Sequence, residues 1–206
     1  MKIITEITPQ VKNPKRCSIF LDGEFFCGMT LETVMKNRLK VGMSVTKEEL
    51  EQIQLDSERT AALDKAMTFL SGSVKTEKQT RDYLKDKGYT YAVINYVADK
   101  LKEYGFLNDG YYAKRFAESY SDKKGVRLIK NELRKKGVSE DDAELAVADI
   151  GDQAEAALVI AEKYMRGKER DLKTRQKLYR HLLSKGFTYD DAKSAYEKIF
   201  NDQYDE

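Results

Sequence analysis

Residues 132–139 read ELRKKGVS, and the same pattern occurs twice more, as YLKDKGYT at residues 83–90 and HLLSKGFT at residues 181–188. Each copy contains leucine, two variable residues, lysine, glycine, an apolar residue and then threonine or serine. The glycines are 49 residues apart, and the same step relates residues in the flanking segments, namely Met67, Phe116 and Met165 before the pattern and Val97, Ala146 and Ala195 after it. So many coincidences in register indicate an internal repeat.

The Lys-Gly step is typical of a helix that ends and is followed at once by another. Lysine complements the negative C-terminal end of a helix, and glycine adopts the left-handed backbone conformation at little steric cost. The threonine or serine two residues later is a good N-cap, and acids in the next turn favour the positive helix end. We therefore expect three helices in each repeat: an opening helix, a middle helix that ends at Lys-Gly, and a third helix.

The first 57 residues have a different pattern. Alternation in KIITEIT (residues 2–8) predicts a strand, and KRCSIFLDGEFFCGM (residues 15–29) predicts two strands joined by a two-residue Asp-Gly turn. If that turn pairs Leu21 with Glu24, Ser18 lies opposite Cys27 and Cys17 points to the other face. Short helices are expected in TLETVMKNR (residues 30–38) and, from a Thr-x-x-Glu capping box, over residues 46–53.

The sequence thus predicts a mainly α fold. Three tandem three-helix repeats form an elongated curved array, and a small N-terminal α/β module that contains a β-hairpin precedes them. The expected boundaries are residues 1–57 for the module and residues 58–109, 110–151 and 152–206 for the repeats. The opening helix of the first repeat is expected over residues 57–72, separate from the helix over residues 46–53.

Composition limits the class of protein. The 206 residues include 37 Lys or Arg and 35 Asp or Glu, so the formal net charge is only +2 and any affinity for nucleic acid must come from the arrangement of charge. There is no run of 18 apolar residues and no signal-peptide core at the N-terminus, which favours a cytoplasmic protein without membrane contact. The two cysteines are expected to be reduced and structural.

The sequence shows no constellation of residues for an enzyme. It has neither a glycine-rich phosphate-binding loop nor Cys and His residues at metal-ligand spacing, and the single histidine, His181, has no evident catalytic or metal-binding partner. We therefore expect no catalytic residues, no metal and no cofactor.

Charge is arranged along the second half of the chain in blocks. Residues 111–137 contain nine basic and three acidic residues, residues 138–155 contain seven acidic and no basic ones, and residues 163–185 contain nine basic and two acidic ones. Helix ends account for about one charge each, so a basic surplus remains. Arg127, Lys130 and Arg134 lie on one face of the middle helix of the second repeat, and a similar set recurs in the third.

This basic surplus has two interpretations. It is either an ordinary solvated helix face or an interaction surface, whose natural ligands are a phosphate backbone or an acidic protein groove. On the second interpretation, the candidate residues for binding nucleic acid or a filament are Lys114, Arg115, Lys123, Lys124, Arg127, Lys130, Arg134, Lys135, Lys173, Lys177 and Arg180.

Residues 103–147 resemble the signature of the RecX family of recombination regulators. The resemblance lies in an aromatic-Leu-Asn-Asp turn, a helix with an Ala-x-Arg-Phe segment, a glycine followed by basic and apolar positions, and the Lys-Gly step, here Phe106, Leu107, Asn108, Asp109, Ala113, Arg115, Phe116, Gly125, Arg127, Ile129, Leu133, Lys136 and Gly137. The three-fold repeat and the β-containing N-terminal extension are also similar to this family, so the resemblance covers essentially the whole chain.

The resemblance implies a non-enzymatic regulator. RecX-like proteins bind the RecA recombinase filament on single-stranded DNA and usually lower strand exchange and ATP hydrolysis, with the repeat array in the helical groove of the filament. It implies a monomer that binds single-stranded DNA weakly, with double-stranded DNA as an open alternative. A second hypothesis is a helical-repeat protein that binds DNA directly without contact to RecA. A third is an enzyme, and the remaining one is a helical-repeat scaffold with unrelated partners.

Overall fold

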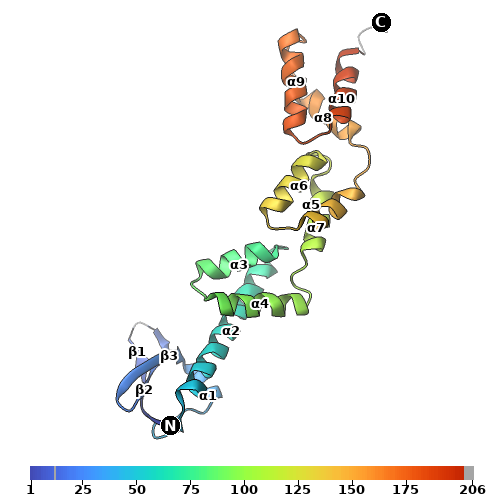
Figure 1. Cartoon of the computed structure of the whole chain (residues 1–206). Helices are drawn as coiled ribbons and strands as arrows, with labels where there is room; N and C mark the ends of the chain where they lie inside the picture. Colours follow the sequence, from blue (N-terminus) through green and yellow to red (C-terminus); the bar gives the residue numbers. More distant parts are fainter. Residues whose placement is uncertain (12, 202–206) are drawn as a thin grey trace. The chain divides into compact units, whose positions relative to one another are not determined.

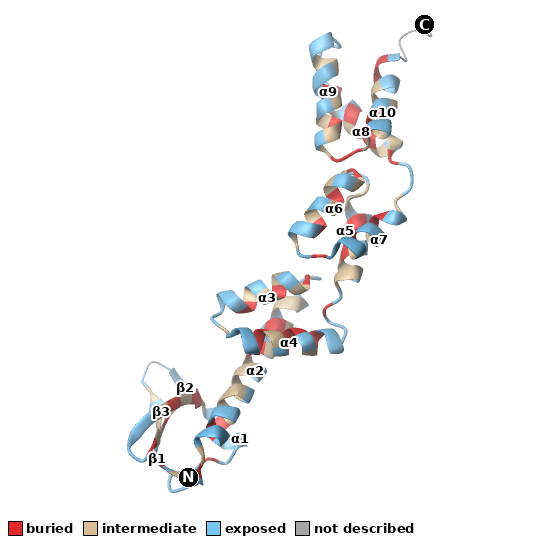
Figure 2. Ribbon diagram, viewed as in Figure 1, coloured by how far each residue is buried: buried red, intermediate tan, exposed pale blue. Residues whose placement is uncertain are grey.

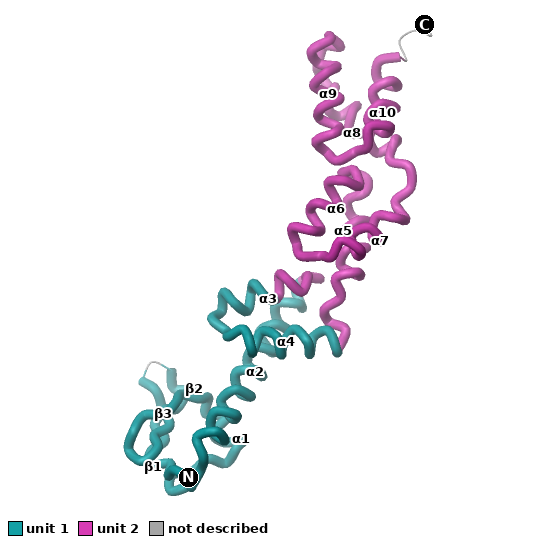
Figure 3. The backbone as a smooth tube through the Cα atoms, viewed as in Figure 1, with its two compact units in different colours: residues 1–72, 81–103 teal, residues 73–80, 104–206 magenta. Residues whose placement is uncertain are grey.

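A computed structural model describes residues 1–11 and 13–201, over which the chain forms four strands and ten helices (Figure 1). The chain divides into two compact units (Figure 3). Unit 1 comprises residues 1–72 and 81–103, and unit 2 comprises residues 73–80 and 104–206. The mainly helical class and the small N-terminal strand module are confirmed, whereas the curvature of the repeat array stays a prediction.

The N-terminal module of unit 1 is built on one antiparallel sheet. Its strands are β1 (Lys2–Gln10), β2 (Asn13–Leu21), β3 (Glu24–Thr30) and β4 (Ser44–Val45), in the order β3-β2-β1-β4. The expected hairpin joins β2 to β3, and its two turn residues, Asp22 and Gly23, have positive φ angles of 49° and 86°. Positive φ at both central positions is what a two-residue hairpin turn of type I′ requires.

The expected register along this hairpin is wrong beyond the first two pairs. Leu21 pairs with Glu24 as predicted, but the register shifts after Phe20, so that Ile19 lies opposite Cys27 and Ser18 opposite Gly28. The shift leaves one extra residue on β3, which is a β-bulge. Because a shift of one residue exchanges the two faces of a strand, Cys17 and Cys27 both belong to the buried core of the module, and both are free thiols.

Two helices complete the module and lead into the first repeat. They are α1 (Leu31–Lys36) and α2 (Lys47–Ser71), and the predicted capping box of Thr46 and Glu49 is present at the start of α2. The predicted break between residues 53 and 57 is wrong, because α2 is continuous over 25 residues. No glycine or proline interrupts this stretch, and Asp56 accepts hydrogen bonds from Gln52 and Arg59 on its own helix.

The three repeats follow the predicted plan of three helices each. In the first, α2 is followed by α3 (Glu77–Asp86) and α4 (Tyr91–Glu103), and α2 packs against α4. The second contains α5 (Asp109–Tyr120), α6 (Val126–Lys135) and α7 (Glu140–Ala148), and the third α8 (Ala154–Met165), α9 (Leu172–Ser184) and α10 (Tyr189–Asn201). In unit 2 the second and third repeats each have their own buried apolar cluster (Figure 2).

The three Lys-Gly joints have the predicted geometry. Gly88, Gly137 and Gly186 have φ angles of 85°, 91° and 88°. In each joint the residue after the glycine donates its backbone N–H to the carbonyl of the repeated leucine, over 3.2 Å to Leu84, 3.1 Å to Leu133 and 3.4 Å to Leu182. These are Schellman-type helix ends, and the three leucines that accept the bonds are fully buried.

Within unit 2, the joints at Gly137 and Gly186 are each contacted by the N-terminal end of the middle helix of the preceding repeat. The hydroxyl of Thr76 donates to the carbonyl of Lys136 over 2.7 Å, and the Lys78 side chain covers Gly137. At the third repeat, the N–H of Gly125 donates to the carbonyl of Lys185 over 2.9 Å. The glycines therefore provide both the turn and the space for the neighbouring helix end.

Candidate functional site

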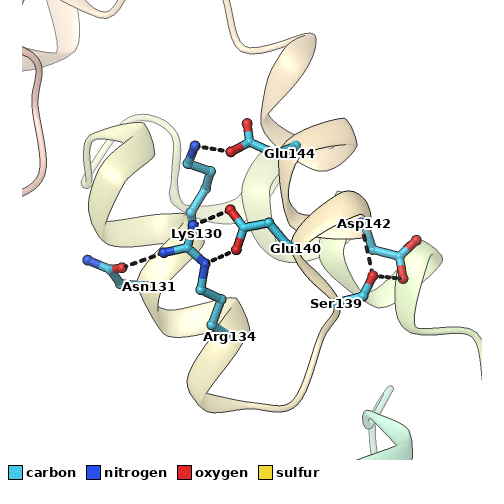
Figure 4. Close-up of polar contacts among 7 residues, drawn as sticks. All are labelled: Lys130, Asn131, Arg134, Ser139, Glu140, Asp142 and Glu144. Atoms are coloured by element: carbon cyan, nitrogen blue, oxygen red, sulfur yellow. Dashed lines mark hydrogen bonds and ion pairs between the residues drawn. The ribbon is translucent and has the colours of Figure 1, made fainter.

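The basic face of α6 is turned toward the acidic helix α7. Lys130 forms an ion pair with Glu144, and the guanidinium of Arg134 forms a bidentate pair with Glu140 (Figure 4). These pairs are placed symmetrically about Gly137, seven and three residues on either side of it. Folding α6 and α7 back on each other at this glycine therefore brings the basic and acidic blocks together.

The pairing between α6 and α7 also alters the ionisation of both partners. The hydrogen bonds from Arg134 lower the pKa of the Glu140 carboxyl, and the bonds to Glu140 raise the pKa of Arg134. Asn131 accepts a further hydrogen bond from Arg134 over 3.2 Å. Bidentate Arg–carboxylate geometry gives orientation as well as attraction, so the pair fixes the direction of the Arg134 side chain.

Three other candidate residues of the second repeat also have partners within the chain. Lys124 pairs with Glu132 over 2.6 Å, and Lys123 lies 3.5 Å from Asp122. The guanidinium of Arg127 lies 5.2 Å from the centre of the Tyr189 ring, which belongs to the third repeat. This contact is within the range of a cation–π interaction.

The remaining candidates have exposed side chains that, in the described part of the chain, form no ion pair and no hydrogen bond. They are Lys114 and Arg115 on α5, Lys135 at the end of α6, and Lys173, Lys177 and Arg180 on α9. At the start of α9, Asp171 caps the helix by accepting from the Thr174 N–H over 2.7 Å, and the bonds from Thr174 lower the pKa of its carboxyl. The structure therefore separates the candidates that have an ion pair or a cation–π contact in the chain from those that have neither, although the charges of Lys173 and Lys177 also contribute to the lowered pKa of Asp171.

A group of residues that sequence reasoning did not select lies between α9 and α10. A groove of about 430 Å³ there is lined by Leu172, Arg175, Gln176, Tyr179, Arg180, Lys193, Tyr196 and Glu197. Of these, only Arg180 was a candidate. The 49-residue step could have identified two of the others, because Tyr179 and Lys193 stand where the second repeat has Lys130 and Glu144.

Residues 1–11 and 13–201 contain no cluster of three or more His, Cys, Asp or Glu side chains that could hold a metal ion. None of the helices in that part of the chain is both long and apolar enough to cross a membrane. His181 stacks on Tyr164 with ring centres 4.5 Å apart, and burial, followed by the charges of Lys185 and Lys168, lowers its pKa. This histidine is thus part of the packing of the third repeat.

Four family models match the chain and together cover most of it. They are the regulatory protein RecX N-terminal domain over residues 2–46 and the first, second and third three-helix domains of RecX over residues 62–106, 108–147 and 151–196. Curated relatives agree. The regulatory protein RecX of Clostridium botulinum (strain Alaska E43 / Type E3) is 36% identical over an alignment of 210 positions, which covers 99% of each chain. The chain belongs to the RecX family.

Other RecX proteins and structures support the same assignment. The regulatory protein RecX of Clostridioides difficile (strain 630) is 34% identical over the full length of both chains. A crystal structure of regulatory protein RecX matches 98% of this chain with a TM-score of 0.70, and at 24% identity it supports the fold. A crystal structure of RecX from Lactobacillus salivarius matches 69% of this chain, at 26% identity and a TM-score of 0.62.

Proposed function

We propose that this RecX-family protein is a non-enzymatic and mainly negative regulator of the RecA recombinase. It binds the RecA filament on single-stranded DNA in the cytoplasm through basic faces of its helical repeats. The observation that carries the proposal is the match to all four RecX domains along one chain, since a whole regulatory architecture is present rather than one domain.

The pattern of ion pairs supports a refined placement of the contact. Lys173, Lys177 and Arg180 form no ion pair in the described part of the chain, so they are available to a partner's phosphates or carboxylates. Lys130 and Arg134 contribute only if the partner displaces Glu144 and Glu140. Exposed pairs of this kind are weak because water screens them, so a highly charged filament can compete with them.

The test begins with the unmodified protein. RecA should retain it in a pull-down when single-stranded DNA and nucleotide are present, and the protein should lower RecA-driven strand exchange. No retention and no inhibition would refute the proposed function.

A second step tests where the surface lies. Charge reversal at Arg127, Lys130, Arg134, Lys173, Lys177 and Arg180 should abolish inhibition, whereas reversal at Lys173, Lys177 and Arg180 alone should remove most of it. Lys40→Glu, Lys47→Glu and Lys65→Glu combined, at exposed lysines outside the candidate set, are the control for the change in net charge of the three-residue variant. Unchanged inhibition by the six-residue variant would mean that the surface lies elsewhere.

The alternative, direct DNA binding without contact to RecA, predicts a different dependence on salt and on the recombinase. A binder that neutralises about six phosphates loses on the order of 10³-fold in affinity between about 50 and about 200 mM salt. A regulator that recognises the filament should instead bind it far more tightly than bare DNA at the same salt concentration.

A further inference from the structure

The groove between α9 and α10 lies where, in the other two repeats, polar side chains bridge the corresponding helices. Two positions, seven residues before and seven residues after the joint glycine, face each other across the middle and third helices. In the first repeat they are Arg81 and Asn95, joined by a hydrogen bond of 2.6 Å, and in the second they are the ion pair Lys130 and Glu144. The polar bridge is thus present in two repeats that differ in sequence.

In the third repeat the same two positions hold Tyr179 and Lys193, and no hydrogen bond joins their side chains in the described chain. Lys193 turns instead toward Glu197 on its own helix, 3.9 Å away. The next groove residue, Tyr196, replaces the buried Val147 of the second repeat. The face that is bridged in the first two repeats is therefore open in the third, where α9 and α10 have 13 residues each, against 10 in α6 and 9 in α7 of the second repeat.

The lining of this groove combines aromatic rings with cations. Tyr179 and Tyr196 lie edge to face, with ring centres 6.2 Å apart. Arg175 lies over the ring of Phe200 at 4.6 Å, and its Nε is buried without a hydrogen-bond partner in the described residues. Arg180 is exposed at the rim. The lining therefore presents aromatic rings next to an exposed cation.

We propose that this groove binds single-stranded DNA, with phosphates on Arg180 and Lys193 and an unpaired base against the Tyr179 and Tyr196 rings. Phosphates match the cations, and Glu197 is the one carboxylate among the lining residues. Aromatic rings beside cations are how proteins hold unpaired bases, which duplex DNA does not offer. The inference rests on the proposed function and deepens it, because it makes DNA the contact of the third repeat.

The test measures binding of a fluorescein-labelled oligothymidylate to the full chain by anisotropy, without recombinase. Tyr179→Lys combined with Lys193→Glu transplants the bridge of the second repeat into the groove, and should weaken binding by about tenfold, the loss typical of one stacked base. Arg180→Gln combined with Lys193→Gln should weaken binding and lower the salt slope by about 1.4, since each phosphate contact to a single strand contributes about 0.7.

The matched control is Lys198→Gln, at an exposed lysine on α10 that does not line the groove, and it should leave affinity unchanged. Circular dichroism melting identifies any variant that fails to fold. If the Tyr179 variant fails to fold, the Arg180 and Lys193 variant still tests the proposal, because Arg180 is exposed. The proposal is overturned if affinity for the oligonucleotide stays within about twofold in the Arg180 and Lys193 variant. It is also overturned if the groove variants lose affinity for the RecA filament but not for the oligonucleotide, since the groove would then contact the recombinase rather than DNA. If the groove variants lose oligonucleotide binding but the unmodified protein has no effect on RecA, the groove proposal is supported and the proposed function is refuted.

Discussion

The joint glycines allow the turn and the contact between repeats to be measured separately. Gly88 and Gly186 have nearly the same left-handed backbone, with φ angles of 85° and 88°. A Cβ atom at Gly88 would have no neighbour within 4 Å, whereas a Cβ atom at Gly186 would overlap with the backbone nitrogen and Cβ of Leu128. Gly88→Ala therefore changes only the backbone strain, and Gly186→Ala changes both.

The expected magnitudes follow from these surroundings. A left-handed residue with a Cβ costs about 1–2 kcal/mol, and this is the whole expected effect of Gly88→Ala. At Gly186 an overpacking cost of about 1–3 kcal/mol is added. Pushing α6 away also weakens the hydrogen bonds from Gly125 N–H to Lys185 and from Arg127 N–H to Gly186, each worth about 1 kcal/mol. We expect Gly186→Ala to cost about 2–5 kcal/mol or more.

A third substitution removes the strain and keeps the clash. Gly125 has an ordinary φ of −72°, but a Cβ there would overlap with the backbone of Gly186 and Phe187. Gly125→Ala should therefore destabilise the protein by about 1–3 kcal/mol through overpacking alone. Gly151→Ala is the matched control in the same unit, because a Cβ at Gly151 has no neighbour within 4 Å.

The assay is guanidinium-induced unfolding followed by far-UV circular dichroism on all four variants. The expected order of destabilisation is Gly186→Ala first, then Gly125→Ala and Gly88→Ala, with Gly151→Ala near the unmodified protein. Equal losses for Gly88→Ala and Gly186→Ala would refute the reasoning, because the contact with Leu128 would then contribute nothing. A neutral Gly125→Ala would refute it as well.

Four further outcomes are expected. Gln153 is buried and accepts from the Val126 N–H while donating to the carbonyls of Ser121 and Lys124, so Gln153→Leu should cost about 2–4 kcal/mol in thermal unfolding. Pairing with Arg134 lowers the pKa of the Glu140 carboxyl from 4.5 in the folded protein. The pairing therefore stabilises the fold fully above pH 4.5, and this stabilisation is lost as the pH falls through the lowered pKa. Arg134→Gln should raise the pKa of Glu140, measured by NMR titration of its carboxyl group. Glu140→Gln combined with Glu144→Gln releases Arg134 and Lys130, so filament affinity should rise and its salt dependence should steepen. Burial raises the pKa of the Cys27 thiol, so a thiol reagent should modify it only slowly until the chain is unfolded.

The sequence predicted best what is decided within a few neighbouring residues. The three glycine joints and the Thr46 capping box depend on residues at most six positions apart, and all have the expected geometry. The predicted break in α2 is wrong, because residues 54–56 contain no glycine or proline and remain inside the helix. The bulge in β3 had no local signal, since Phe25, Phe26 and Cys27 are all compatible with either register.

For the candidate residues, the sequence predicted where the charged blocks lie but not which residues form ion pairs with one another. The sequence shows that basic and acidic blocks flank Gly137, and it predicts helix-end charges with a basic remainder rather than ion pairs. The symmetric positions of Arg134 and Glu140, and of Lys130 and Glu144, follow only when the two helices are folded back on each other. The Arg127 contact with Tyr189 joins residues 62 positions apart and required the packing of two repeats.

The same symmetry shows where uncompensated charge remains. In the second repeat the acids of α7 face the bases of α6 and neutralise two of them. In the third repeat the Asp191 carboxylate accepts from the N–H and the hydroxyl of Thr188 at the start of its own helix, and Glu197 pairs with Lys193. No acid of α10 pairs with Lys173, Lys177 or Arg180 in the described chain. Since attraction to a polyanion comes from cations that lack an intramolecular partner, two equally basic segments should bind unequally, and the third repeat should dominate.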